Sequence, residues 1–289
     1  MMYTVLGRNV VKILLLIVFV SLSLILNAKQ QKKETFFKNG YCIQKTAKTQ
    51  VEGEKFIKAK IHGKWGKFEL KDFPEKFVKW NTGDRLEQLN NYKNMMMGKD
   101  AKDVKLAGAH NGVVATYGYQ REDSRFKLNN AVKGMGFLPK RNKIKEIIKL
   151  MDETADASML DKMDILTKFY ENPDSIFALD KQISLELYSQ KEFMTQTFLN
   201  QMTDPAATIV YLDIPSFKLK TITRLLDPND PELSDYEKDV VSYINKMHSY
   251  FHGHFSRDFI AVIYYVVEVY DNSPRGKDPE TGMGRKMSK

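Results

Sequence analysis

Residues 259–269 read FIAVIYYVVEV, an almost uninterrupted run of apolar residues rich in Val, Ile and Tyr. Only Glu268 breaks it. Such a run is typical of a strand at the centre of a sheet, where both faces are covered. We therefore expect residues 259–269 to form the central strand, and we place the other elements around it.

The sequence before this run predicts two strands and three helices. The strands are residues 207–212 and 217–226, joined by the turn Asp213-Ile214-Pro215-Ser216. The helices should end before Pro173, before Pro205 and at Gly253. Each helix start pairs a serine with an acidic residue three positions later, a pattern that caps a first turn: Ser158 with Asp161, Ser189 with Glu192, and Ser234 with Glu237. The resulting order indicates an α+β fold, an antiparallel or mixed sheet with packed helices.

The N-terminal part predicts a β-hairpin. Residues 55–61 alternate between apolar and lysine positions, as a half-buried strand does. Residues 62–66, HGKWG, supply the turn, and residues 67–70 return as the partner strand. This places Trp65 at the tip among lysines, where it either inserts into an interface or a membrane surface or folds back onto the core. A helix over residues 84–97 and a strand over 113–119 follow.

The first 28 residues have the order of a signal peptide. Arg8 and Lys12 precede an uncharged run, residues 13–26, and then Asn27-Ala28. The run is shorter than the ~18 to 20 residues needed to span a bilayer. We expect cleavage after Ala28 and a periplasmic or secreted protein, with an uncleaved membrane anchor as the alternative.

Four regions follow from these patterns. Residues 1–28 are the signal peptide or uncleaved anchor. Residues 29–140 form a basic, strand-rich N-terminal region, residues 141–270 an α+β C-terminal domain, and residues 271–289 a flexible tail. The boundary is set by Pro139-Lys140-Arg141, where a hinge within one domain would give the same pattern.

The net charge of +9 is concentrated near the N-terminus. Residues 29–80 contain 14 Lys against 6 Asp and Glu, a net charge of +8. A Lys-rich segment is attracted to an anionic membrane surface or an acidic partner, and the attraction weakens as salt rises. A solvated surface that only keeps the protein soluble is the alternative. Export argues against nucleic acid as the partner.

Three of the five histidines, His248, His252 and His254, lie within seven residues. His248 and His252 are spaced i and i+4 on one helix, so both rings can face the same point. Three histidines with Asp258 as a fourth ligand would suit zinc or copper. Alternatively, His248 packs at the core edge while His252 and His254 stabilise the helix C-terminus.

Other candidates are weaker. His110 lies in a glycine-bracketed loop before a strand, where catalytic residues often occur. The only cysteine, Cys42, is expected to be a small buried residue, with intermolecular pairing or nucleophilic chemistry as alternatives. Residues 227–232, DPNDPE, offer carboxylates for calcium, but two prolines and no glycine favour a lead-in to the Ser234 helix.

Residues 200–226 run from a helix end through Asp204-Pro205-Ala206-Ala207 and a strand to a second strand ending in Arg224-Leu225-Leu226. This stretch resembles the middle of flavin-binding split-barrel proteins of the pyridoxamine-phosphate-oxidase type. The resemblance implies a flavin cofactor. The sequence has no G-x-S-x-G, P-loop, G-x-G-x-x-G or H-E-x-x-H motif. We therefore expect an exported binding or interaction protein, with a flavin-binding protein or another enzyme as the alternative.

Overall fold

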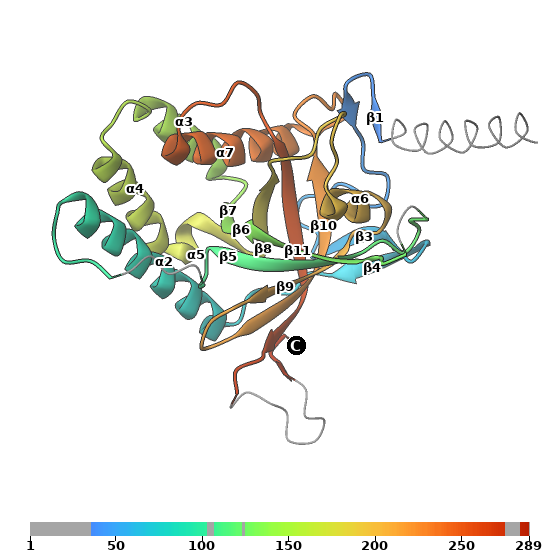
Figure 1. Cartoon of the computed structure of the whole chain (residues 1–289), viewed down its shortest axis with the longest axis horizontal. Coiled ribbons are helices and arrows are strands. Elements are labelled where there is room, and N and C mark those ends of the chain that lie inside the picture. Colours follow the sequence, from blue (N-terminus) through green and yellow to red (C-terminus); the bar gives the residue numbers. More distant parts are fainter. Residues whose placement is uncertain (1–35, 103–106, 123–124, 275–283, 289) are drawn as a thin grey trace, which may run out of the picture.

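The computed structural model describes residues 36–102, 107–122, 125–274 and 284–288 (Figure 1). The predicted signal peptide or anchor, residues 1–28, lies outside the described residues. Within the described ranges, no helix is both long and apolar enough to cross a membrane.

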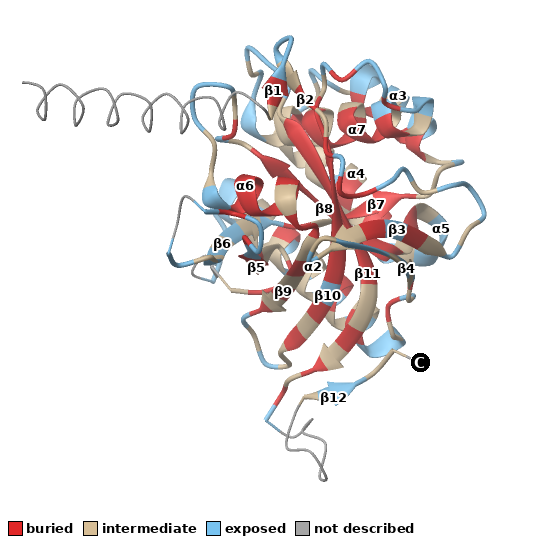
Figure 2. Ribbon diagram, turned by 90° about the vertical axis from the view of Figure 1, so that its right-hand side faces the viewer, coloured by how far each residue is buried: buried red, intermediate tan, exposed pale blue. Residues whose placement is uncertain are grey.

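One antiparallel sheet forms the body of the molecule, and the α+β prediction is confirmed. Its strands follow the order β6-β5-β9-β10-β11-β8-β7. The predicted central strand is β11, which pairs with β10 on one side and β8 on the other, and it is buried from Ile260 to Val266 (Figure 2). The strand bounds are β5 Asn111–Tyr117, β6 Leu128–Gly134, β7 Gly136–Pro139, β8 Phe177–Glu186, β9 Ala206–Tyr211, β10 Phe217–Leu226 and β11 Ile260–Asp271.

This sheet closes on itself. Its two end strands, β6 and β7, are consecutive in the chain and separated only by Met135. β6 pairs with β5, whereas β7 pairs with β8 at the opposite end of the strand order. The segment 128–139 thus joins both ends of the sheet, and a single chain segment completes a cylinder of six antiparallel strands.

The interior of the closed sheet contains buried polar groups as well as apolar ones. Gln182 on β8 accepts a hydrogen bond from the Tyr211 hydroxyl at 3.1 Å. Tyr264, opposite Gln182 on β11, accepts one from Gln201 at 3.4 Å. Burying polar groups costs less when they are hydrogen-bonded, and these two bonds link β8 to β9 and β11 to the helical segment 196–203.

The helices cover the outside and one end of the sheet (Figure 1). Ser158 and Ser234 cap their helices as predicted, and Ser234 forms the complete capping box with Glu237. The predicted start at Ser189 is wrong: Thr195 caps that helix instead, accepting from the Phe198 N–H. The bounds are α2 Glu75–Met96, α3 Ile144–Glu153, α4 Met159–Glu171, α5 Pro173–Ile176, α6 Gln196–Thr203 and α7 Asp235–His252.

Several elements differ from the sequence-based expectation. α2 begins at Glu75, well before the predicted residue 84. β8 was not expected. Strands from both sides of the predicted boundary near residue 140 belong to the same sheet. Within the predicted tail, β12 (Arg285–Lys286) pairs with the end of β11.

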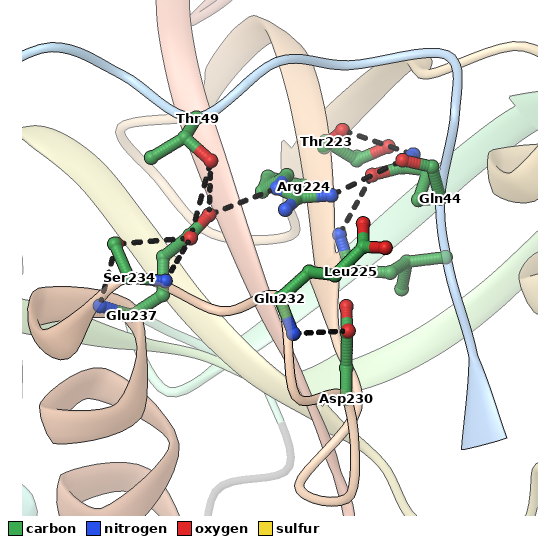
Figure 3. Close-up of polar contacts among 9 residues, drawn as sticks. All are labelled: Gln44, Thr49, Thr223, Arg224, Leu225, Asp230, Glu232, Ser234 and Glu237. Carbon is green, nitrogen blue, oxygen red and sulfur yellow. Dashed lines mark hydrogen bonds and ion pairs between the residues drawn. The ribbon is translucent and has the colours of Figure 1, made fainter.

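A buried polar network fastens the N-terminal segment to the end of β10 that extends beyond its pairing with β9 (Figure 3). Gln44 donates to the carbonyls of Gln201 and Thr223 and accepts from the Leu225 N–H. Arg224 donates to the Gln44 carbonyl at 3.2 Å and to the Glu237 carboxylate at 3.0 Å. Both charged side chains are almost fully buried. The pair therefore connects the N-terminal segment, β10 and α7.

Replacing Glu237 with Gln should destabilise this junction, because the buried Arg224 guanidinium loses its counter-charge. We expect a fall in unfolding free energy of about 3 kcal/mol, measured by urea denaturation. Glu232→Gln is the matched control, since Glu232 is exposed and bonds only through its backbone N–H. Equal stability of the two variants would contradict this role.

Candidate functional site

The basic hairpin forms as predicted from two strands, β3 Phe56–Ile61 and β4 Lys64–Glu69. Its turn is shorter than expected. His62 and Gly63 alone make it, both with positive φ, as two-residue hairpin turns require. The predicted five-residue turn was therefore wrong, and Trp65 lies on β4 rather than at the tip.

Trp65 is the centre of a basic surface on the hairpin. Its side chain is 50% exposed, and Lys60 lies directly opposite it on β3. The Lys48 ammonium lies 5.3 Å from the Trp65 ring centroid, a cation–π contact. The next pair along the same face is Lys58 opposite Lys67. We call Lys48, Lys58, Lys60, Trp65 and Lys67 the basic face.

Several lysines of the N-terminal segment form ion pairs. Lys55 pairs with Asp72, Lys71 with Glu69, and Lys79 with Glu75. By contrast, no carboxylate of the described residues lies within ion-pair distance of a basic-face lysine. Like charges directly opposite each other destabilise a strand pair. Cation–π contacts of Lys48 with Trp65 and of Lys67 with Phe56, at 5.3 and 3.5 Å from the ring centroids, offset part of this repulsion.

A shallow hollow of about 410 Å³ lies at the other end of the hairpin. Lys55, Lys71, Glu69 and Asp72 are among its lining residues. These charges pair with one another at 2.9 and 2.8 Å. The hollow therefore offers a ligand little uncompensated charge, unlike the basic face.

The histidine cluster is only partly assembled. The rings of His248 and His252 lie 4.8 Å apart, while His248 stacks on Phe255 at 4.6 Å and meets Phe259 edge-on. His254 and Asp258 are exposed. Among the residues that the structure describes, no three His, Cys, Asp or Glu side chains are grouped so as to hold a metal ion. This geometry favours packing of His248 at the core edge, and the metal site stays a prediction.

His110 is partly buried rather than placed at an open site. Its Nδ1 lies 2.9 Å from the Met135 carbonyl, which can only accept, so Nδ1 carries the ring proton. Burial, with a further contribution from the Arg85 charge, lowers the pKa of His110 to about 4. The neutral His110 ring is thus hydrogen-bonded to Met135, the residue between β6 and β7 at which the sheet closes.

The two remaining candidates have structural contacts. Cys42 is buried, and burial raises the pKa of its thiol, which makes it a poor nucleophile. Its N–H donates to Asp227 at 2.9 Å. Asp227 and Asp230 also accept from the N–H groups of Asn229 and Glu232. These bonds shape the lead-in to α7, which favours that prediction over a calcium loop.

Sequence reasoning missed a group of exposed apolar residues on the β5–β6 hairpin. Tyr117, Tyr119, Phe126 and Leu128 are 44%, 47%, 85% and 63% exposed. The His62 ring stacks on Tyr119 at 4.7 Å, so this hairpin meets the turn of the basic hairpin. Apolar residues near a strand end are ordinarily core residues, and no local signal distinguishes these.

The metal hypothesis makes a direct prediction. The double variant His248→Ala, His252→Ala should retain less zinc or copper than the wild-type chain, as measured by elemental analysis. His62→Ala serves as a control, because His62 lies on a different element. Unchanged metal content in the double variant would rule out a site at these residues.

The partly buried His110 should make stability depend on pH. Its folded pKa of about 4 lies below the unfolded value of about 6.5, so the unfolded chain binds the proton first as pH falls. The stabilisation is complete above pH ~6.5 and is lost as pH falls towards ~4. Between these values, the wild type should lose about 3 kcal/mol more unfolding free energy than His110→Gln. Parallel pH profiles in urea denaturation would contradict this.

Comparison with known proteins does not identify a family for this chain. The chain matches no protein-family model, and a search of curated proteins found no significant match. The functional argument therefore rests on the chemistry of the chain's own residues.

Proposed function

We propose that this chain is an exported interaction protein that docks on an anionic membrane surface through the basic face. The observation that carries the proposal is the half-exposed Trp65 beside Lys48 and Lys60, with Lys58 and Lys67 as the next pair on the same face; these four lysines lack carboxylate partners in the described part of the chain. Tryptophan favours the boundary between water and lipid, because its ring is apolar and its N–H is polar.

The charge pattern supports lipid headgroups as the ligand. Each lysine held near an anionic bilayer contributes about 1 kcal/mol of attraction. The basic face presents four of them within two strands and the adjoining segment, where Lys48 N–H bonds to the Lys58 carbonyl. A bilayer would offset the repulsion between Lys58 and Lys67, which face each other across the hairpin.

An enzyme or flavin-binding protein is the second candidate. The closed sheet of six antiparallel strands is the kind of architecture that the split-barrel resemblance of residues 200–226 implies. Helix α6 and strands β9 and β10 occupy that stretch in the expected order. A yellow purified protein with a flavin absorption spectrum would favour this candidate over membrane docking.

Vesicle partitioning tests the docking proposal. The full chain should partition more strongly into vesicles of phosphatidylcholine and phosphatidylglycerol in equal parts than into phosphatidylcholine alone, and added salt should reduce the difference. Replacing Lys58, Lys60 and Lys67 with Gln should weaken the anionic preference about 100-fold, at about 1 kcal/mol per lysine.

The matched control removes the same charge elsewhere. Lys145, Lys149 and Lys238 are exposed on α3 and α7 and make only long ion pairs of 3.6 to 3.8 Å. Their triple Gln variant should keep most of the anionic preference. Equal losses in the two triple variants, or equal binding of the wild type to both vesicle types, would refute docking through the basic face.

A further inference from the structure

Four exposed apolar residues lie towards one end of the β5–β6 hairpin. Tyr117 pairs directly with Leu128 across the two strands. Tyr119 and Phe126 follow on either side of the connection, and Phe126 is 85% exposed. We call Tyr117, Tyr119, Phe126 and Leu128 the apolar tip. Contiguous exposed apolar side chains of this kind mark interaction sites on soluble domains.

The base of the apolar tip is held firmly by buried polar contacts. Arg121 is only 6% exposed and donates to Gln196 at 2.6 Å and Asn200 at 2.8 Å, both on α6. Asn200 in turn donates to the Lys127 carbonyl, and the Gly118 N–H bonds to the same carbonyl. These contacts hold both sides of the base against α6.

The apolar tip is continuous with the basic face. The turn residue His62 stacks on Tyr119 and lies 6.3 Å from Tyr117, ring centroid to ring centroid. The His62 N–H is fixed by Asp204 at 2.8 Å. In Figure 1 the β3–β4 turn and the β5–β6 tip end side by side at the right of the molecule. Lysines and apolar side chains thus share one end of the fold.

We propose that the apolar tip inserts into the bilayer whose headgroups the basic face contacts, an inference that rests on the proposed function. Lysines would lie at the headgroups while Phe126 and Leu128 enter the acyl boundary. This is the division that interfacial membrane proteins use. A second copy of the chain is a poorer occupant, because it would bring an identical cluster of unpaired lysines to the same contact.

The start of the described chain lies at the same end. Phe36 and Phe37 pack on Phe198 of α6, with ring centroids 6.4 and 5.7 Å away. α6 also carries the Gln196 and Asn200 side chains that hold the base of the tip.

Site-specific fluorescence tests the insertion. Phe126→Cys, labelled with the polarity-sensitive dye NBD, should show a blue shift and a gain in emission when the full chain meets vesicles of phosphatidylcholine and phosphatidylglycerol in equal parts. Cys42 should not react, because it is buried and burial raises the pKa of its thiol. Lys145→Cys on α3 is the control label and should show no shift.

A second variant needs no label. The double variant Phe126→Ser, Leu128→Ser should reduce vesicle partitioning by about tenfold or more, because it removes two apolar side chains whose transfer from water to lipid favours binding. The dependence on anionic lipid should remain. Val51→Ser with Leu212→Ser is the control, because both residues are exposed on other segments.

The outcomes separate the two proposals. A wild-type chain with no anionic preference refutes the proposed docking and the insertion with it. An anionic preference with an unshifted NBD label at position 126 refutes the insertion alone. Concentration-dependent dimerisation in the absence of lipid, abolished by the double serine variant, would assign the apolar tip to a second copy instead.

Discussion

The structure depends on one pairing constraint, the exchange of strand partners at Met135. Residues 128–134 pair with β5 and residues 136–139 pair with β8, so one continuous segment holds the first and last strands of the sheet together. The His110 carbonyl accepts from the Met135 N–H, and the His110 ring bonds to the Met135 carbonyl. A sheet closed in this way has no long strand edge left unpaired. Side chains must fill its interior, and the polar groups buried there must be hydrogen-bonded.

Closure also determines where an interaction surface can form. The N-terminal segment is bonded to the end of β10 through the Gln44–Arg224–Glu237 network, which also holds α7 there (Figure 3). The hairpin β3–β4 forms its own two-stranded sheet outside the closed one, with Ile57 and Ala59 buried beneath it. One face of the hairpin is therefore available for lysines and Trp65, and the end of the β5–β6 hairpin extends that surface.

The sequence predicts local features well and long-range pairing poorly. The apolar run of β11 and the capping box at Ser234 depend on neighbouring residues and were found where predicted. β8 was missed because Lys181, Gln182 and Glu186 are polar yet buried. Tyr211 donates to Gln182 and Lys133 pairs with Glu186, contacts between residues that are distant in the sequence. Composition identified the Lys-rich segment, but whether a given lysine is paired depends on residues as distant as Asp271, which pairs with Lys76. The apolar tip gives no local signal at all.

Amide hydrogen exchange on the vesicle-bound full chain is the most direct measurement of the central claim. Membrane docking through one end of the fold predicts added protection in peptides covering β3–β4 and residues 117–128, with α3 and α7 unchanged. Protection centred on α3 and α7, or no change in either hairpin on addition of anionic vesicles, would contradict the account.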